Sequence, residues 1–169
     1  ICIDTILEAH RCGINLIDTA PGYNFGNSEV IVGQALKKLP REQVVVETKC
    51  GIVWERKGSL FNKVGDRQLY KNLSPESIRE EVEASLQRLG IDYIDIYMTH
   101  WQSVPPFFTP IAETVAVLNE WKSEGKIRAI GAANVDADHI REYLQYGELD
   151  IIQAKYSILD RAMENELLP

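Results

Sequence analysis

The chain of 169 residues is poor in cysteine, with only three, and its basic side chains are outnumbered by acidic ones. Cys2, Cys12 and Cys50 are odd in number and form no Cys-x-x-Cys pair, which argues against a disulfide framework and predicts free thiols and a cytoplasmic location. The net charge of −7 argues against a nucleic-acid partner, which requires a basic surface. No apolar run reaches the roughly 18 residues of a transmembrane helix, so no membrane partner is predicted.

Two kinds of motif are also missing. No G-x-G-x-x-G or P-loop pattern follows an apolar run, so the phosphate loop of an open dinucleotide-binding sheet is absent. No His-x-His or similar cluster has the spacing of metal ligands, so no metal site is predicted. The composition, with 45% hydrophobic and 25% charged residues, is typical of one soluble globular domain, which we expect to cover residues 1–169.

Helical and extended patterns alternate along the chain. Stretches with apolar residues three or four positions apart, which indicate helices, begin near residues 3, 27, 74, 109 and 136. Short apolar or β-branched runs, typical of buried strands, cover residues 14–18, 44–49, 93–98, 127–130 and 149–153. Residues 54–73 have no clear period, and we interpret them as a long loop. The alternation predicts right-handed βαβ units.

The predicted strands all end on polar side chains that can bind or catalyse. These residues are, in chain order, Asp18, Lys49, His100, Asn134 and Gln153. Because the carboxyl ends of the strands form the active-site face of a (β/α)8 barrel, and no phosphate loop is present, the sequence favours an α/β fold of the TIM-barrel type. Only about five of the eight βα units are present. Both ends of the sequence fall within predicted helices, so we expect a part of a longer barrel.

Asp18, Tyr23, Lys49 and His100 form a chemically sensible set. Each of the first three residues, taken alone, is more often structural, and His100 alone is evenly divided between the two readings. Together they support a different interpretation, because a phenol with an ordinary pKa of about 10 becomes a usable acid beside an ammonium group. A carboxylate can hold that ammonium in place, and a histidine can orient a carbonyl oxygen. The set predicts a site that protonates a carbonyl while another group delivers hydride.

Three stretches of the sequence resemble the aldo-keto reductases. They are Ile17-Asp18-Thr19-Ala20 followed by Tyr23, residues 92–101, and residues 125–131 running on to Asn134. The resemblance covers nearly the whole chain and implies a (β/α)8 barrel that reduces small aldehydes or ketones, methylglyoxal among them, with NADPH or NADH. It implies that Tyr23 is the proton donor, that Asp18 and Lys49 tune it, and that His100 orients the substrate.

The same resemblance assigns the cofactor contacts. Asn134 and Gln153 would hold the nicotinamide carboxamide beside Asp18, and no metal is implied. The family's usual serine before the asparagine is Ala133 here, which puts one hydrogen bond to the carboxamide in doubt. The segments that read the adenosine phosphate would lie beyond this sequence, so the choice between NADH and NADPH stays open, as does the oligomeric state.

Two alternatives remain. One is a nicotinamide-sensing, non-catalytic subunit of a larger complex, which could keep the same residues. The other is a metal-dependent barrel hydrolase that uses Asp18 and His100, although the sequence shows no ligand cluster for it. If the chain is alone, half a barrel exposes two parallel sheet edges, and we expect weak cofactor binding and little turnover.

Overall fold

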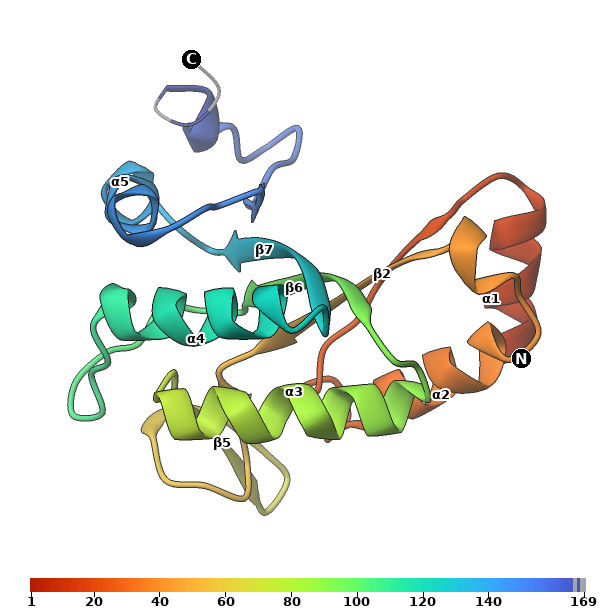
Figure 1. The fold of residues 1–169 in the computed structure, drawn as a ribbon, viewed down its shortest axis with the longest axis horizontal. Coiled ribbons are helices and arrows are strands. Elements are labelled where there is room, and N and C mark those ends of the chain that lie inside the picture. The colour runs from red at the N-terminus through yellow and green to blue at the C-terminus, as the bar shows by residue number, and fades with distance from the viewer. Residues whose placement is uncertain (166, 168–169) are drawn as a thin grey trace.

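The computed structural model describes residues 1–165 and 167, so the helix start expected at residues 166–169 lies largely outside the described residues. Five parallel strands form one sheet in the order β1-β2-β6-β7-β8. They are β1 (Leu16–Asp18), β2 (Val45–Cys50), β6 (Ile94–Thr99), β7 (Ile127–Ala133) and β8 (Ile151–Gln153). The sheet curves into about half of a (β/α)8 barrel (Figure 1), which confirms the predicted fold class.

Helices precede β1 and connect the successive strands of this sheet. They are α1 (Cys2–Arg11), α2 (Asn27–Leu36), α3 (Pro75–Leu89), α4 (Ile111–Ser123) and α5 (Ala137–Tyr146). Short 3-10 helices cover Arg41–Gln43 and Ala162–Asn165. None of the described helices has the length and hydropathy needed to cross a membrane.

The helices begin close to the positions predicted from the sequence. Ser74 Oγ accepts a hydrogen bond from the backbone N–H of Ser77 (3.3 Å) at the start of α3, and Gly90, with φ of 67°, ends that helix. Asp136 Oδ1 accepts a hydrogen bond from the backbone N–H of His139 (2.9 Å) at the start of α5. These caps fix both ends of α3 and the start of α5 relative to the strands that carry the candidate site.

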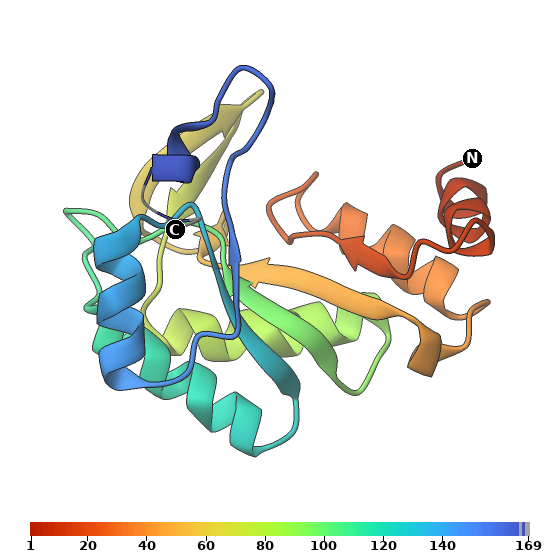
Figure 2. The ribbon, with the colours of Figure 1, turned by 90° about the horizontal axis from the view of Figure 1, so that it is seen from above.

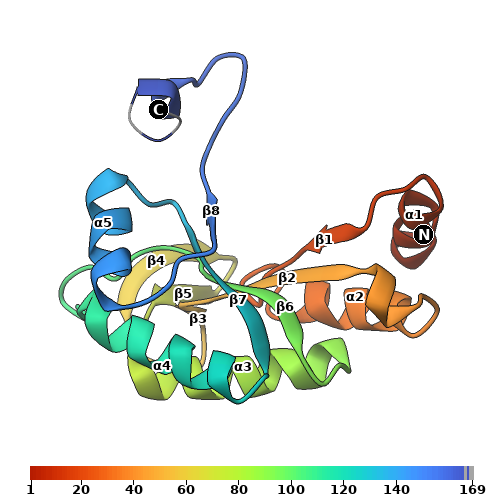
Figure 3. The same ribbon diagram turned by 45° about the horizontal axis from the view of Figure 1, so that its top comes forward.

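Helices α2, α3 and α4 cover the outer face of the sheet (Figure 3). The main core lies between them and the strands, and its fully buried members include Val46, Val82, Tyr97, Leu118 and Ile130. At Gly33 the backbones of α2 and α3 approach so closely that a Cβ atom would lie 2.5 Å from the carbonyl oxygen of Leu89. This contact leaves no room for any side chain at Gly33.

A buried network of hydrogen bonds links β2 to α2 and α3. Thr48 Oγ1 donates a hydrogen bond to Glu29 Oε1 (2.6 Å), and Arg88 Nε donates to Glu29 Oε2 (2.6 Å). Glu29 is 0% exposed, so its charge depends on Arg88 for compensation. This network connects α2 and α3 to β2, the strand that holds Lys49.

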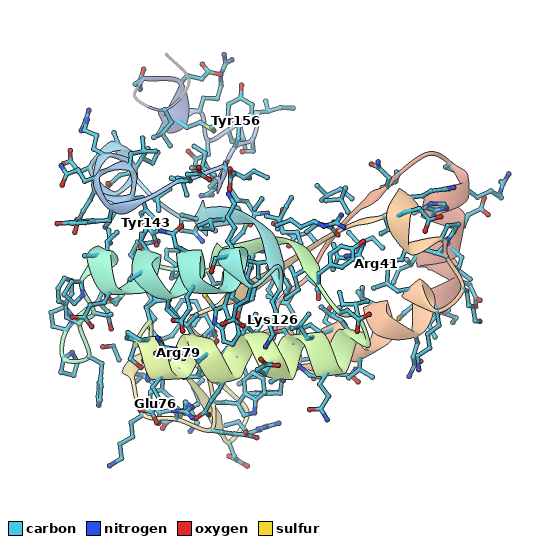
Figure 4. All side chains as sticks on the ribbon, in the orientation of Figure 1. Arg41, Glu76, Arg79, Lys126, Tyr143 and Tyr156 are labelled. Carbon is cyan, nitrogen blue, oxygen red and sulfur yellow. The ribbon has the colours of Figure 1, made fainter. Side chains whose placement is uncertain are left out.

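Other polar contacts join the outer elements of the half-barrel. Tyr143 of α5 is buried, and its hydroxyl lies 2.9 Å from Thr99 Oγ1 and 3.0 Å from Gln102 Oε1 (Figure 4). Arg79 of α3, which is labelled in Figure 4, forms an ion pair with Glu120 of α4 (2.7 Å). The contact between Tyr143 and Thr99 fixes the end of β6 immediately before His100.

The interpretation of residues 54–73 as a loop is wrong. Most of this segment forms β4 (Ser59–Val64) and β5 (Arg67–Lys71), which join β3 (Ile52–Val53) in a second, antiparallel sheet in the order β3-β5-β4. All residues of β4 after Ser59 are exposed, so the strand buries no apolar face and shows no alternating pattern. The hairpin of β4 and β5 projects from the carboxyl end of the large sheet (Figure 2).

Candidate active site

The polar residues predicted at the strand ends lie at one edge of the large sheet. Asp18 and Gln153 end β1 and β8, Lys49 is next to last in β2, and His100 and Asn134 directly follow β6 and β7. All four strand pairings are parallel, so the carboxyl ends of the five strands meet there. The backbone continues this edge, because the N–H of His100 donates to the carbonyl of Cys50 (2.9 Å) and that of Asn134 to the carbonyl of Gln153 (3.0 Å).

Lys49 is the centre of this group. Its side chain is 0% exposed, and its ammonium group donates hydrogen bonds to the Asp18 carboxylate and to the carbonyl oxygen of Thr19 (3.2 Å). Glu47 Oε1 lies 3.5 Å from the same nitrogen. A buried ammonium needs such partners, because transfer out of water is costly for an unpaired charge.

Tyr23 reaches this group from the turn between β1 and α2. Asn24 and Phe25 have positive φ values of 52° and 53°, a left-handed conformation that is uncommon outside glycine, and Gly26 follows with 85°. The Tyr23 ring is 43% exposed, its centroid lies 5.7 Å from Lys49 Nζ, and its centroid is 5.6 Å from that of His100 at an interplanar angle of 84°. The structure therefore brings together the four residues that the sequence pairs in its candidate site.

His100 is held as a neutral imidazole. Burial, followed by the charge of Lys49, lowers its pKa from 6.5 to about 4, and the Asp18 carboxylate opposes this only in part. Its Nδ1 is buried and finds no hydrogen-bond partner among the described residues. A neutral imidazole carries one N–H donor, which is what the orientation of a carbonyl oxygen requires.

A proton titration of His100 tests this assignment. In NMR spectra of a full-length enzyme that carries this chain, we expect the chemical shifts of the His100 imidazole C–H protons to change with pH around a midpoint of about 4. The unfolded chain binds the proton at an ordinary pKa of about 6.5, so His100 makes stability fall as pH drops from about 6.5 to about 4. A midpoint near 6.5 in the folded protein would show that His100 is hydrated and protonated like a free side chain.

Asn134 and Gln153 have the chemistry to hold a carboxamide. Asn134 Nδ2 donates to the carbonyl oxygen of His100 (2.9 Å), and Gln153 Nε2 donates to Asp18 Oδ2 (3.1 Å) and Glu47 Oε1 (3.0 Å). With both amide nitrogens engaged, the side-chain oxygens of Asn134 and Gln153 remain as acceptors within the described part of the chain. Two acceptors suit the two N–H groups of a nicotinamide carboxamide, so these residues fit the cofactor.

Glu47 is the residue that sequence reasoning missed. It is 4% exposed, and burial, then the charge of Asp18, raises its pKa, while Lys49 acts in the opposite direction. The signal was present in the sequence, because residues two apart in a strand share one face and Glu47 stands two positions before Lys49.

Aromatic and basic side chains gather beside the site. Trp101, which follows His100, packs against Phe61 of β4 with ring centroids 5.8 Å apart, and Lys71 of β5 lies 4.7 Å from the Trp101 ring centroid. On the turn that carries Tyr23, the Phe25 ring packs against Trp54 and lies 3.7 Å from the guanidinium carbon of Arg67.

Among residues 1–165 and 167, no group of three or more His, Cys, Asp or Glu side chains is placed to bind a metal ion.

The fold and this arrangement of Asp, Tyr, Lys and His agree with a family match. A protein-family model described as the aldo/keto reductase family matches residues 2–169. The chain belongs to the aldo/keto reductase family. It is 99% identical over 169 residues to the NADH-specific methylglyoxal reductase of Escherichia coli (strain K12), covering all of this chain and 52% of that protein.

Solved structures agree with the fold. The glycerol dehydrogenase AKR11B4 from Gluconobacter oxydans matches with a TM-score of 0.88 and 36% identity, over 99% of this chain and 48% of that one. An aldo-keto reductase from Klebsiella pneumoniae in complex with NADPH matches with a TM-score of 0.79 and 28% identity, over 99% of this chain and 52% of that one. The chain thus spans about half the length of the relatives it matches.

Proposed function

We propose that this chain supplies the catalytic half of an enzyme that reduces small aldehydes and ketones with a nicotinamide cofactor. The observation that carries the proposal is the buried Lys49, paired with Asp18 and placed 5.7 Å from the Tyr23 ring, with His100 packed against that ring. The near identity to a methylglyoxal reductase makes methylglyoxal the first substrate to test.

The residues divide the reaction between them. A bound nicotinamide cofactor would supply the hydride for the reduction. Tyr23 donates its hydroxyl proton to the carbonyl oxygen, so that hydride and proton together convert the carbonyl to an alcohol. Lys49 stabilises the negative charge left on the phenol oxygen, Asp18 holds Lys49 in place, and His100 donates a hydrogen bond to the carbonyl oxygen.

The cofactor contacts belong to the same proposal. Asn134 and Gln153 would bind the carboxamide, with Asp18 close by through its hydrogen bond with Gln153. We propose NADH as the cofactor, because the relative that shares 99% of the sequence is named as NADH-specific. NADPH stays a candidate, since a more distant member of the family has been crystallised with it.

Tyr23→Phe is the first test. In a full-length enzyme that carries this chain, we expect the variant to lose about 10³-fold in kcat with methylglyoxal, because no other group replaces the lost proton donor. The loss is followed by nicotinamide absorbance, with NADH and NADPH compared side by side.

Tyr146→Phe is the matched control, since Tyr146 is an exposed tyrosine at the end of α5. Its turnover should equal that of the unchanged enzyme. Cofactor binding without turnover in the unchanged enzyme would favour a nicotinamide-sensing subunit instead. No cofactor binding at all would contradict both functions.

A further inference from the structure

A second carboxylate lies beside the Asp18–Lys49 pair, and its place is set by the strand register. In the parallel pairing of β1 with β2, Asp18 is the direct partner of Glu47. Partners in adjacent parallel strands project from the same face of a sheet, so both carboxylates face the barrel interior. Lys49 follows on that face two residues later.

The contacts of Glu47 connect it to two other residues of the site. Its Oε1 lies 3.5 Å from Lys49 Nζ and accepts a hydrogen bond from Gln153 Nε2 (3.0 Å). The Glu47 side chain is 6% exposed, whereas that of Asp18 is 36% exposed. The Lys49 ammonium therefore lies beside two carboxylates: that of Asp18, which is partly hydrated, and that of Glu47, which is buried in the interior of the half-barrel.

We propose that Glu47 is a positioning residue that acts through Lys49: it offsets part of the ammonium charge and thereby keeps Tyr23 protonated, and able to donate, to more alkaline pH. The proposal rests on the proposed reductase function of the site. Glu47 does not touch the reacting atoms in this account, and its influence passes through the ion pair with Lys49.

The charge balance gives the direction of the effect. Asp18 and Lys49 alone sum to zero, and an ionised Glu47 leaves the group with one excess negative charge. Within the described residues, the other ionisable groups near the Lys49 ammonium are Tyr23 itself and His100, which is neutral above a pKa of about 4. Gln153 contributes only an amide. Excess negative charge disfavours a phenolate, so the loss of Glu47 favours release of the phenol proton.

The raised pKa of Glu47 means that its negative charge, and therefore its effect on Tyr23, is present only at higher pH. Burial and the neighbouring Asp18 raise the pKa of Glu47, so its carboxyl is charged only above that raised value. At lower pH a protonated Glu47 and a glutamine at this position are nearly equivalent. The unchanged enzyme and the Glu47→Gln variant should therefore differ in activity at the high pH where activity falls, and should have similar activity on the plateau of the pH profile.

The test is the pH profile of carbonyl reduction in a full-length enzyme that carries this chain. For Glu47→Gln we expect the alkaline limb of kcat/KM with methylglyoxal to move about one pH unit lower, with plateau activity kept within a few-fold. Glu47→Asp, which withdraws the carboxylate by one methylene, should shift the limb in the same direction by less. An unshifted limb in Glu47→Gln, or in Glu47→Asp where Glu47→Gln does not fold, would overturn the proposal.

Glu81→Gln is the matched control. Glu81 is a buried carboxylate with a pKa raised to about 7 by burial, and it accepts hydrogen bonds from the Gly51 N–H (2.8 Å) and Ser77 Oγ (2.9 Å). Its substitution removes the same charge without any contact with Lys49, so its alkaline limb should stay in place. An equal shift in Glu81→Gln would assign the effect to general loss of buried charge and overturn the role of Glu47.

The outcome separates this proposal from the function on which it depends. If the unchanged enzyme reduces no carbonyl, or if Tyr23→Phe keeps its activity, the proposed function fails. If the unchanged enzyme loses activity at high pH, Tyr23→Phe is inactive and Glu47→Gln keeps the original limb, only the role of Glu47 is wrong.

Discussion

Lys49→Met, in a full-length enzyme that carries this chain, is expected to lower kcat for carbonyl reduction by about 10³-fold. Methionine fills most of the space of the lysine stem but removes the charge that stabilises the phenolate of Tyr23. It also leaves Asp18 and the buried Glu47 without their shared cation. The measurement is steady-state turnover of methylglyoxal, together with a fluorescence titration of cofactor binding.

A comparison of turnover with cofactor binding isolates the chemical step. The Kd for the cofactor should change far less than kcat, because Asn134 and Gln153 are untouched. Lys37→Met, at an exposed lysine after α2, provides a matched control that should keep full activity. A loss of less than about tenfold in kcat for Lys49→Met would mean that Tyr23 works without help from the ammonium.

Arg88→Met is expected to have the largest effect on stability. Glu29 is 0% exposed, and Arg88 Nε is the cation that lies 2.6 Å from its carboxylate. Removal of one partner of a buried pair typically costs about 3–5 kcal/mol, because the other charge is left uncompensated. We expect the free energy of unfolding, measured by urea denaturation of a full-length enzyme, to fall by about that amount.

The double variant Arg88→Met with Glu29→Gln distinguishes charge from packing. If the uncompensated carboxylate is the cause, the double variant should recover a large part of the loss, and a double-mutant cycle gives the coupling energy. Additive losses from the two substitutions would contradict this explanation and point to the packing of the Arg88 stem.

The positions of the strand ends could be predicted because β2, β6 and β7 bury apolar side chains, and because Ile17 of β1 and Ile152 of β8 pack against the core. Residues such as Val46 and Ile130 lie in the core, so their pattern in the sequence records their burial. The hairpin could not be predicted in this way, because Leu60 and Val64 of β4 are 62% and 48% exposed and a strand without a buried face has no period. Its remaining signal was the turn at Gly65, where φ is 61°.

The residues of the candidate site also differ in how far the sequence alone predicts their positions. Asp18, Lys49 and His100 could be placed together because they share the carboxyl edge of one sheet. The approach of Tyr23 depends on left-handed backbone at Asn24 and Phe25; asparagine is enriched in that conformation, but phenylalanine gives no sign of it. The spacing of Glu47 and Lys49 predicts that they share one face of β2, but the sequence alone does not show that Glu47 also contacts Gln153.

The attachment of the β4–β5 hairpin has an evolutionary consequence. Its base is anchored, since Ser59 and Leu69 are buried and Ser59 Oγ accepts a hydrogen bond from the Phe107 N–H (3.1 Å), whereas the rest of β4 is exposed. Beyond this base, the side chains of Phe61 and Arg67 contact Trp101 and Phe25, whereas exposed residues such as Lys63 and Val64 can change without disturbing the parallel strands. Sequence variation can therefore accumulate at such exposed positions of the hairpin during evolution, while the residues at the ends of the parallel strands stay fixed.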